Sequence, residues 1–234
     1  MLLKGGEGLY CGTVISAGDA KNTFLNMVRR EHLPKEFIAS VEEWKASESF
    51  FYVYLGVDMD LKTMGFDGTP IWYFPKEMDR KSFPMLGGDA VGIGMPSVLE
   101  PSLCPEGKGI VILGMTASCT FMSGCPVRTG GKKDAYRAVK EKIGDYLVDI
   151  AAEAIPGLKE KIEVKVVASP HTFERYTMNY LGASSGWSMA ADQQNKLSIE
   201  TPLPGLLMAG HWTMNPGGVP AAFVSGKLVA EEIR

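Results

Sequence analysis

The last thirty residues place the strongest limit on the fold. Gly205 to Arg234 reads GLLMAGHWTMNPGGVPAAFVSGKLVAEEIR, in which a short apolar run and a glycine precede a Pro-Gly-Gly-Val-Pro turn and a stretch of small residues. A short all-apolar run is typical of a buried parallel strand, and Pro220 suits the first helical turn, where no N–H is needed. The segment therefore predicts a strand, a turn and a helix.

The turn itself has two interpretations. Gly217 and Gly218 permit positive φ angles and close approach of another group to the backbone, and the helix N-terminus that follows is left open. Free N–H groups at such an end favour an anionic or carbonyl-rich ligand edge. The alternative is a strand-to-helix connection without a ligand, and local physics leaves both open.

Composition limits the class of protein. The chain has 234 residues, 45% of them hydrophobic, and a formal net charge of −3, which suits one or two globular domains. Basic residues form no cluster longer than pairs such as Arg29-Arg30, so a nucleic-acid partner is not expected. The four cysteines have neither metal-ligand nor disulfide spacing, which favours reduced thiols in a cytoplasmic protein without a metal site. No signal peptide and no membrane-spanning run is expected.

The rest of the chain mixes strands and helices. Residues 6–17 are predicted to form a hairpin whose second strand is Thr13–Ala17, and Asp19 is the expected N-cap of a helix. β-branched and aromatic runs predict an antiparallel sheet, and a helical period with a Pro-Gly stop predicts one long helix. The expected strands are 49–59, 90–99, 107–118 and 161–169, and the expected helix lies within 132–157. Residues 66–89 form either a lid over a ligand or an irregular surface excursion.

This pattern predicts an α/β (α+β) fold in which the two chain ends form one domain around an inserted middle. We expect residues 1–30 and 166–234 to form a nucleotide-binding type of layer, so that Thr13–Ala17 lies beside Leu206–Gly210. Residues 31–165 would then be a separate domain of antiparallel sheet and helix, carrying an apolar cavity.

Four segments, in order, resemble one known family. They are TVISAGDAKNTFLNMV, PSLCPEGKGIVIL, SPHTFERYTMNYLGASSGW and GLLMAGHWTMNPGGVPAAFVSGKLVAEEI. They are similar to segments of the phytoene desaturase and carotenoid isomerase branch of the FAD-dependent oxidoreductases, which is related more distantly to amine oxidases. The resemblance implies an FAD-binding layer, a substrate domain and a lipophilic polyene or isoprenoid-like substrate.

The resemblance also assigns roles to residues. The positions that match backbone lining the flavin ribityl and ring are Gly210, Gly217, Gly218, Val219 and Pro220. His211 stands where many relatives have an acidic residue that bonds the ribityl side; an imidazole there could donate or accept, or simply cap the strand end. Three aromatics match the region that faces the flavin and a long apolar substrate, although aromatics are often core residues: Tyr176, Tyr180 and Trp187.

One departure from the family is large. Its members begin with a βαβ unit whose G-x-G-x-x-G holds the FAD pyrophosphate. Here the spacing Gly6-x-Gly8 continues to Cys11 where the third glycine should be. We therefore expect the C-terminal part of an enzyme, with an incomplete Rossmann-like layer and incomplete FAD binding. An N-terminal Rossmann-containing half would be its partner, and the fragment alone would be inactive.

Two function classes remain open. The first is an FAD-dependent oxidoreductase of the desaturase type, or of the isomerase type in which reduced flavin acts without net oxidation. The second is a non-catalytic binding or scaffold module. The expected location is the cytoplasm, with peripheral contact with a membrane left open.

Overall fold

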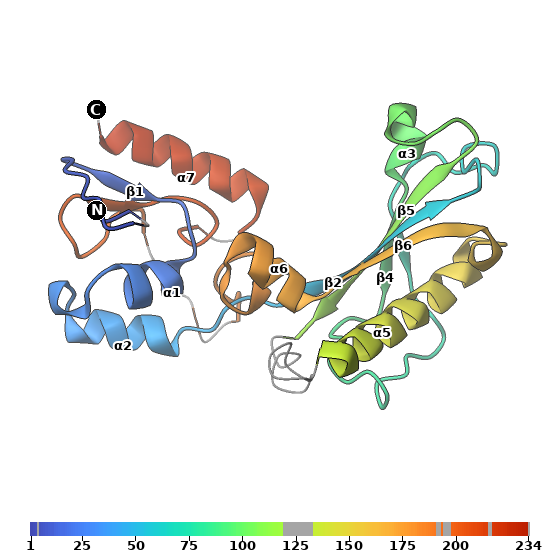
Figure 1. Ribbon diagram of the computed structural model, residues 1–234, viewed down its shortest axis with the longest axis horizontal. Coiled ribbons are helices and arrows are strands. Elements are labelled where there is room, and N and C mark those ends of the chain that lie inside the picture. Colours follow the sequence, from blue (N-terminus) through green and yellow to red (C-terminus); the bar gives the residue numbers. More distant parts are fainter. Residues whose placement is uncertain (4, 119–132, 191–192, 194–197, 215–216, 234) are drawn as a thin grey trace. The chain divides into compact units, whose positions relative to one another are not determined.

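The computed structural model describes residues 1–3, 5–118, 133–190, 193, 198–214 and 217–233 (Figure 1). The chain divides into two compact units. Unit 1 consists of Met1–Glu48 together with Glu174–Arg234, and unit 2 is Ser49–Phe173. A mixed α and β architecture is confirmed, with one parallel and one antiparallel sheet. None of the described helices combines the length and the apolar character needed to cross a membrane.

Unit 1 is built around a two-stranded parallel sheet. Its elements are β1 (Val14–Ser16), α1 (Ala20–Asn22), the π-helix η1 (Thr23–Met27), η2 (Arg30–His32), α2 (Lys35–Glu43), η5 (Tyr180–Gly182), β7 (Leu206–Met208) and α7 (Val219–Glu232). Val14 pairs with Leu206 and Ser16 with Met208. The expected proximity of these two segments is confirmed. The expected hairpin is wrong, because the strand pairs in parallel with β7, nearly two hundred residues later in sequence.

Helices lie on both sides of this small sheet, with α7 on one side of β1 and α1 and α2 on the other (Figure 1). The Asp19 carboxylate caps α1 by accepting from the Asn22 N–H at 2.6 Å, as the sequence predicts. From α2, Ile38 and Val41 are buried, and Phe37 packs edge-on against Phe24 at 4.9 Å. This packing places residues 31–48 in unit 1, which corrects the expected boundary after residue 30.

Unit 2 is a five-stranded antiparallel sheet with one long helix. Its elements are β2 (Ser49–Val57), β3 (Ile71–Tyr73), β4 (Val91–Gly94), α3 (Pro96–Leu99), η3 (Pro101–Leu103), β5 (Gly109–Ala117), α5 (Lys133–Ala154), η4 (Lys159–Lys161) and β6 (Ile162–Ala168), while α6 (Pro170–Thr177) spans the unit boundary. The strand order is β3-β4-β5-β2-β6. The expected strand at 90–99 is shorter, since Pro96 begins helix α3.

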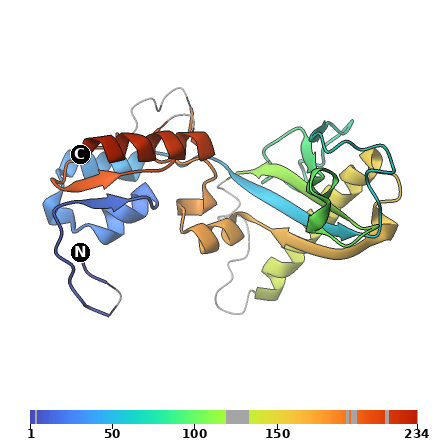
Figure 2. The ribbon, with the colours of Figure 1, turned by 90° about the horizontal axis from the view of Figure 1, so that it is seen from above.

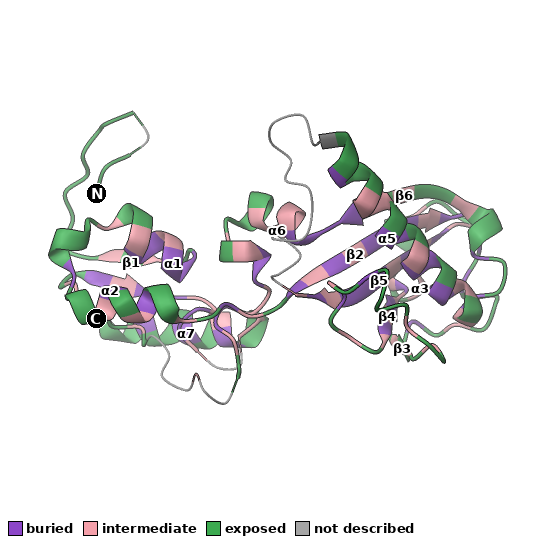
Figure 3. Cartoon of the chain, turned by 90° about the horizontal axis from the view of Figure 1, so that it is seen from below, coloured by how far each residue is buried: buried purple, intermediate pink, exposed green. Residues whose placement is uncertain are grey.

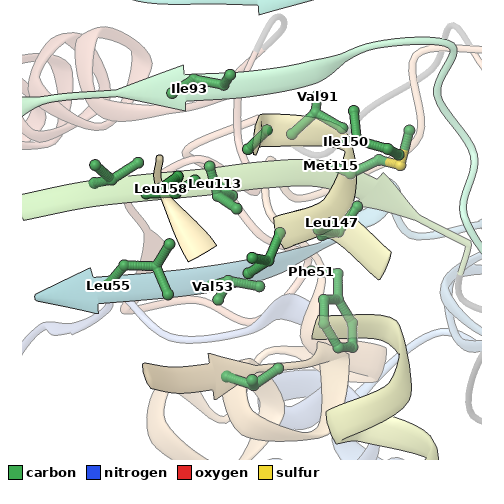
Figure 4. Close-up of a cluster of buried hydrophobic side chains, with 14 of the residues drawn as sticks. Phe51, Val53, Leu55, Val91, Ile93, Leu113, Met115, Leu147, Ile150 and Leu158 are labelled. Atoms are coloured by element: carbon green, nitrogen blue, oxygen red, sulfur yellow. The ribbon is translucent and has the colours of Figure 1, made fainter. Parts of the chain in front are cut away.

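The core of unit 2 lies between the sheet and α5. Alternate residues of β2, such as Phe51, Val53 and Leu55, point to the same buried face, where they meet Leu147 and Ile150 of α5 (Figure 4). The buried stripe along α5 is visible in Figure 3. Because β6 pairs with β2 along most of its length, residues 166–173 belong to unit 2, which corrects the second expected boundary.

Candidate functional site

The carboxyl ends of β1 and β7 meet at one edge of unit 1. The Ala209 N–H donates to the Ser16 carbonyl at 2.9 Å, so the two strands stay paired up to Gly210. Gly210 has a φ of +97°, and its N–H donates at 2.7 Å to the hydroxyl of Ser225, a fully buried residue of α7. The chain thus leaves β7 in a conformation that favours glycine, and α7 is fastened to the end of that strand.

The N-terminus of α7 is open. Its N-cap, Gly218, has a φ of +100° and offers no side chain to cap the helix, and the first turn contains no acidic residue. A Cβ added to Gly218 would have no heavy atom within 4 Å, whereas Val219 and Pro220 are exposed. Pro216, the first residue of the predicted turn, lies outside the described residues. The remaining turn presents backbone donors and the positive end of a helix to open space.

Glycines let a second loop approach this edge. A Cβ on Gly217 would overlap the backbone carbonyl of Ser185, and a Cβ on Gly186 would lie 2.5 Å from the carbonyl oxygen of His211. Figure 2 shows β1, β7 and α7 of this unit from above. The glycine loop at 182–186 lies in the segment that resembles the region facing the flavin, and it is in backbone contact with the turn after β7.

A buried carboxylate ties the same loop to β1. Asp19 is 2% exposed, and while Oδ1 caps α1, its Oδ2 accepts from the Tyr180 N–H at 2.8 Å. Burial raises the pKa of Asp19, and the two backbone N–H groups and the charges of His211 and Lys21 oppose that rise. Asp19 was predicted only as a helix cap, and its second bond joins residues 161 positions apart.

The backbone around Tyr180 is strained. Met178 and Leu181 have φ angles of 59° and 55°, which residues other than glycine rarely adopt. The Met178 N–H donates to the Glu174 carbonyl at 2.8 Å, and Asp19 accepts from the N–H of Tyr180, which directly precedes Leu181. Strain of this kind persists only where surrounding contacts determine the conformation, and it is concentrated at ligand sites.

His211 follows Gly210 and is half-buried. Its Nε2 lies 3.5 Å from the Asn179 amide nitrogen, and the Asn179 amide oxygen accepts from the Trp212 indole N–H at 3.2 Å. Burial lowers the pKa of His211, and the negative charge of Asp19 opposes that effect. The imidazole is therefore favoured in its neutral form at the strand end.

The three predicted substrate aromatics have different surroundings. Trp187 is 2% exposed and packs edge-on against Trp44 at 5.3 Å and Trp212 at 4.8 Å, so it contributes to the core of unit 1. Tyr180 is partly exposed, and the buried Lys21 ammonium lies 4.8 Å from its ring centre. Burial lowers the pKa of Lys21. Tyr176 is 73% exposed. We retain Tyr176 and Tyr180 as candidates for ligand contact and assign Trp187 a packing role.

Unit 2 presents a second candidate surface, the sheet face opposite α5. Residues Phe50, Tyr52, Tyr54, Ile110, Ile112, Trp72, Val164 and Val166 alternate with the core residues of their strands and are half-buried or exposed. Trp72 is 67% exposed and Val166 56%. Side chains in this set are aliphatic or aromatic, and none is charged. The sequence had predicted an apolar cavity, and the structure shows an apolar sheet face.

Two aromatic rings of this face lie over glycines on neighbouring strands. A Cβ on Gly114 would overlap the Tyr52 ring, and one on Gly92 would lie 3.5 Å from the Trp72 ring. Tyr52 is flanked by Phe50 and Tyr54 at ring-centre distances of 5.4 and 6.0 Å, with interplanar angles of 40° and 31°. Glycine on one strand thus lets a ring on the next lie along the sheet, which gives a broad aromatic surface.

Some residues of the site could not be assigned from sequence. Asn179 and Ser225 are ordinary polar residues in the sequence, and only contacts over long separations give them a role. The glycines after β7 carried a readable signal: Gly218 has the positive φ that a glycine pair next to proline predicts, while Gly217 does not and instead allows the close approach of Ser185.

Comparison with known proteins places these features in a family. The model of the flavin containing amine oxidoreductases matches residues 66–234, well over half of the chain. The chain is 26% identical to a chloroplastic prolycopene isomerase of Daucus carota over 238 residues, which covers 99% of this chain and 36% of that protein. It is 24% identical to a neurosporene-forming phytoene desaturase of Cereibacter sphaeroides, covering 98% of this chain and 44% of the relative. The chain therefore spans less than half the length of these relatives.

Solved structures agree on the fold. An oxidoreductase from Methanosarcina mazei matches 94% of this chain and 42% of its own length, with a TM-score of 0.54 and 16% identity. A protein from Pyrococcus furiosus matches 99% of this chain and 43% of its own, with a TM-score of 0.55 and 18% identity. The resemblance read from the sequence is confirmed, and the chain belongs to the flavin containing amine oxidoreductase family.

Proposed function

We propose that this chain is the C-terminal part of an FAD-dependent oxidoreductase that acts on a lipophilic polyene or isoprenoid-like substrate. The observation that carries the proposal is the open glycine turn at the carboxyl ends of two parallel strands, where ligands of open α/β sheets bind. The relatives named for prolycopene and phytoene add the substrate class.

The residues of unit 1 fit the flavin that the family implies. Open space at Gly218 admits a flat group close to the backbone, and the uncapped end of α7 offers N–H donors to a carbonyl-rich edge. Gly210, His211, Gly217, Val219 and Pro220 complete this surface. Bound flavin would supply hydride acceptance, or act in reduced form for isomerisation, and the protein would supply position and electrostatics.

The apolar sheet face of unit 2 suits the substrate side. Its aromatic and aliphatic side chains would hold a hydrocarbon chain through burial alone, and none of the residues named for this face is a carboxylate, a histidine or a lysine. Tyr176 and Tyr180 are further candidates from unit 1. A non-catalytic binding module remains the second candidate function, because the resemblance implies an acidic residue where this chain has His211 and because the sequence has no G-x-G-x-x-G motif.

We propose further that this chain alone binds FAD weakly. In the family, contacts with pyrophosphate and adenosine belong to a βαβ unit with a G-x-G-x-x-G motif, and the sequence of this chain contains no such motif. Loss of about 4 kcal/mol of contact energy weakens affinity about a thousandfold. The missing contacts would come from an N-terminal Rossmann-containing half.

A flavin titration tests both statements. The chain would be titrated with FAD, followed by flavin fluorescence, alone and with the dinucleotide-binding part of a relative added. We expect weak binding alone and strong binding with the added part. Tight, submicromolar binding by the chain alone would refute the incomplete site, and no rescue would favour the binding module.

Matched variants locate the site. Gly218→Val should abolish the rescued binding, because the branched side chain opposes positive φ and fills the open space. Gly226→Val, on α7 and also without a neighbour within 4 Å, is the control and should retain binding.

A further inference from the structure

We propose that His211 is a neutral hydrogen-bond donor, protonated at Nδ1, which recognises an acceptor oxygen of the ligand at the carboxyl ends of β1 and β7. This inference rests on the proposed function for the location of the ligand. Such a bond runs in the opposite direction to one made by a carboxylate, since a carboxylate can only accept.

The orientation of the Asn179 amide follows from its partners. An indole N–H can only donate, so the atom of Asn179 that lies 3.2 Å from the Trp212 Nε1 must be the amide oxygen. The amide nitrogen then lies 3.2 Å from the Ala183 carbonyl, which can only accept. Two partners of fixed character, one on each side, thus give the same orientation.

The tautomer of His211 follows from that orientation. The Asn179 nitrogen that faces the Ala183 carbonyl also lies 3.5 Å from the His211 Nε2. An amide nitrogen donates, so Nε2 has to accept and cannot carry the proton. A neutral imidazole has one donor and one acceptor nitrogen, which leaves the proton on Nδ1.

Among the described residues, the His211 Nδ1 atom has no hydrogen-bond partner that would compete with a ligand. No hydrogen bond within the described residues engages it, and it is not among the enclosed polar atoms that have no partner. Asp19 uses both carboxylate oxygens on the N–H groups of Asn22 and Tyr180. The donor can therefore take a phosphate or carbonyl oxygen, which can only accept, whereas a group that can only donate would be rejected.

Rigid neighbours maintain this arrangement. Trp212 is fully buried and packs against Trp187, and Gly186 brings its backbone against the His211 carbonyl. Asn179 itself sits between two residues with positive φ. A half-buried imidazole held in this way keeps one tautomer, while an exposed one exchanges freely between two.

Imidazole nitrogen NMR tests the tautomer directly. The full chain would be labelled with nitrogen-15 in histidine and studied at pH 8, with the His211 signals identified by their loss in His211→Asn. We expect a protonated Nδ1 and an unprotonated Nε2. A protonated Nε2, or two protonated nitrogens, would overturn the proposal.

Variants of Asn179 test the cause. Asn179→Asp places an acceptor in front of Nε2 and should move the proton there, and Asn179→Ala, which introduces no charge, should give a mixture. Near-ultraviolet circular dichroism would show that each variant is folded. An unchanged His211 tautomer in a folded Asn179→Ala variant would show that Asn179 does not set it.

Ligand binding tests the direction of the bond. Flavin mononucleotide is the probe. His211→Asn keeps a donor and should retain affinity for it. His211→Asp introduces a side chain of the same size as asparagine that can only accept, and its affinity should fall about tenfold or more. Equal affinity of the two variants would overturn the donor role. If the unmodified chain with its added N-terminal part binds no flavin, the proposed function fails, and the NMR result still decides the tautomer.

Discussion

Gly217→Ala should destabilise unit 1 although it adds a single methyl group. The new Cβ would overlap the carbonyl oxygen of Ser185 and would lie 2.7 Å from its carbonyl carbon and 3.0 Å from its Cα. Cβ atoms essentially never approach backbone so closely, so one of the two segments has to move. The Ser185 segment is held by hydrogen bonds from the Ser185 N–H to the Ser47 hydroxyl at 2.9 Å and from the Ser184 N–H and hydroxyl to the Glu48 carbonyl at 3.1 and 2.8 Å.

The magnitude follows from these bonds. Displacing the loop would weaken three hydrogen bonds with a net value of about 1 kcal/mol each, so we expect a loss of about 3 kcal/mol. Gly226→Ala is the matched control: this residue is helical with open space around it, and the change should stabilise by about 1 kcal/mol. Urea unfolding followed by near-ultraviolet circular dichroism measures both. If the two variants had equal stability, the contact of Gly217 with Ser185 would not exist as described.

Three further outcomes are expected. Leu147→Ala removes a fully buried side chain of α5 and should cost about 2–5 kcal/mol in the unfolding free energy of unit 2, measured by urea denaturation. The raised pKa of Asp19 means that the folded state holds its proton to higher pH than the unfolded state, whose pKa is near 3.8. The stability that this group contributes is therefore present below pH 3.8 and is lost as pH rises through the raised pKa. The unfolding free energy of an Asp19→Asn variant, measured across the same pH range, should not show this loss. Gly114→Ala should leave the fold intact, since the Tyr52 ring can turn aside. It should weaken the binding of parinaric acid, a conjugated polyene whose fluorescence reports binding and which stearic acid displaces as a competitor. Unchanged binding would argue against the aromatic face as a ligand surface.

Local signals in the sequence predicted the regular elements well. The strand, turn and helix at the chain end, the strand at 49–59 and the long helix were all readable, because their periodicity and stop residues act over a few positions. The stop after α5 is an example, since Gly157 takes a positive φ of 77° directly after Pro156.

Features that depend on distant contacts were not readable. The strand at 13–17 was predicted to pair within a hairpin, because pattern reasoning pairs a strand with its nearest neighbour in the sequence. In the structure β1 pairs with β7. The residues that form α2 were assigned to the middle domain, and only the packing of this helix on Phe24 shows that they belong to unit 1. Neither residue with a positive φ in the strained turn, Met178 or Leu181, is a glycine, so nothing in the sequence predicts the turn. The hydrogen bond from the Tyr180 N–H to Asp19 could therefore not be predicted either.

The uneven distribution of indole rings gives the molecule a built-in optical label. Of the four tryptophans, Trp44, Trp187 and Trp212 pack together in unit 1, while Trp72 stands exposed on β3 of unit 2. An aqueous quencher such as iodide should therefore extinguish the red-shifted emission of Trp72 first and leave the blue-shifted emission of the cluster. In a Trp72→Phe variant, all tryptophan fluorescence would come from unit 1. The thermal unfolding of unit 1 could then be followed separately from that of unit 2.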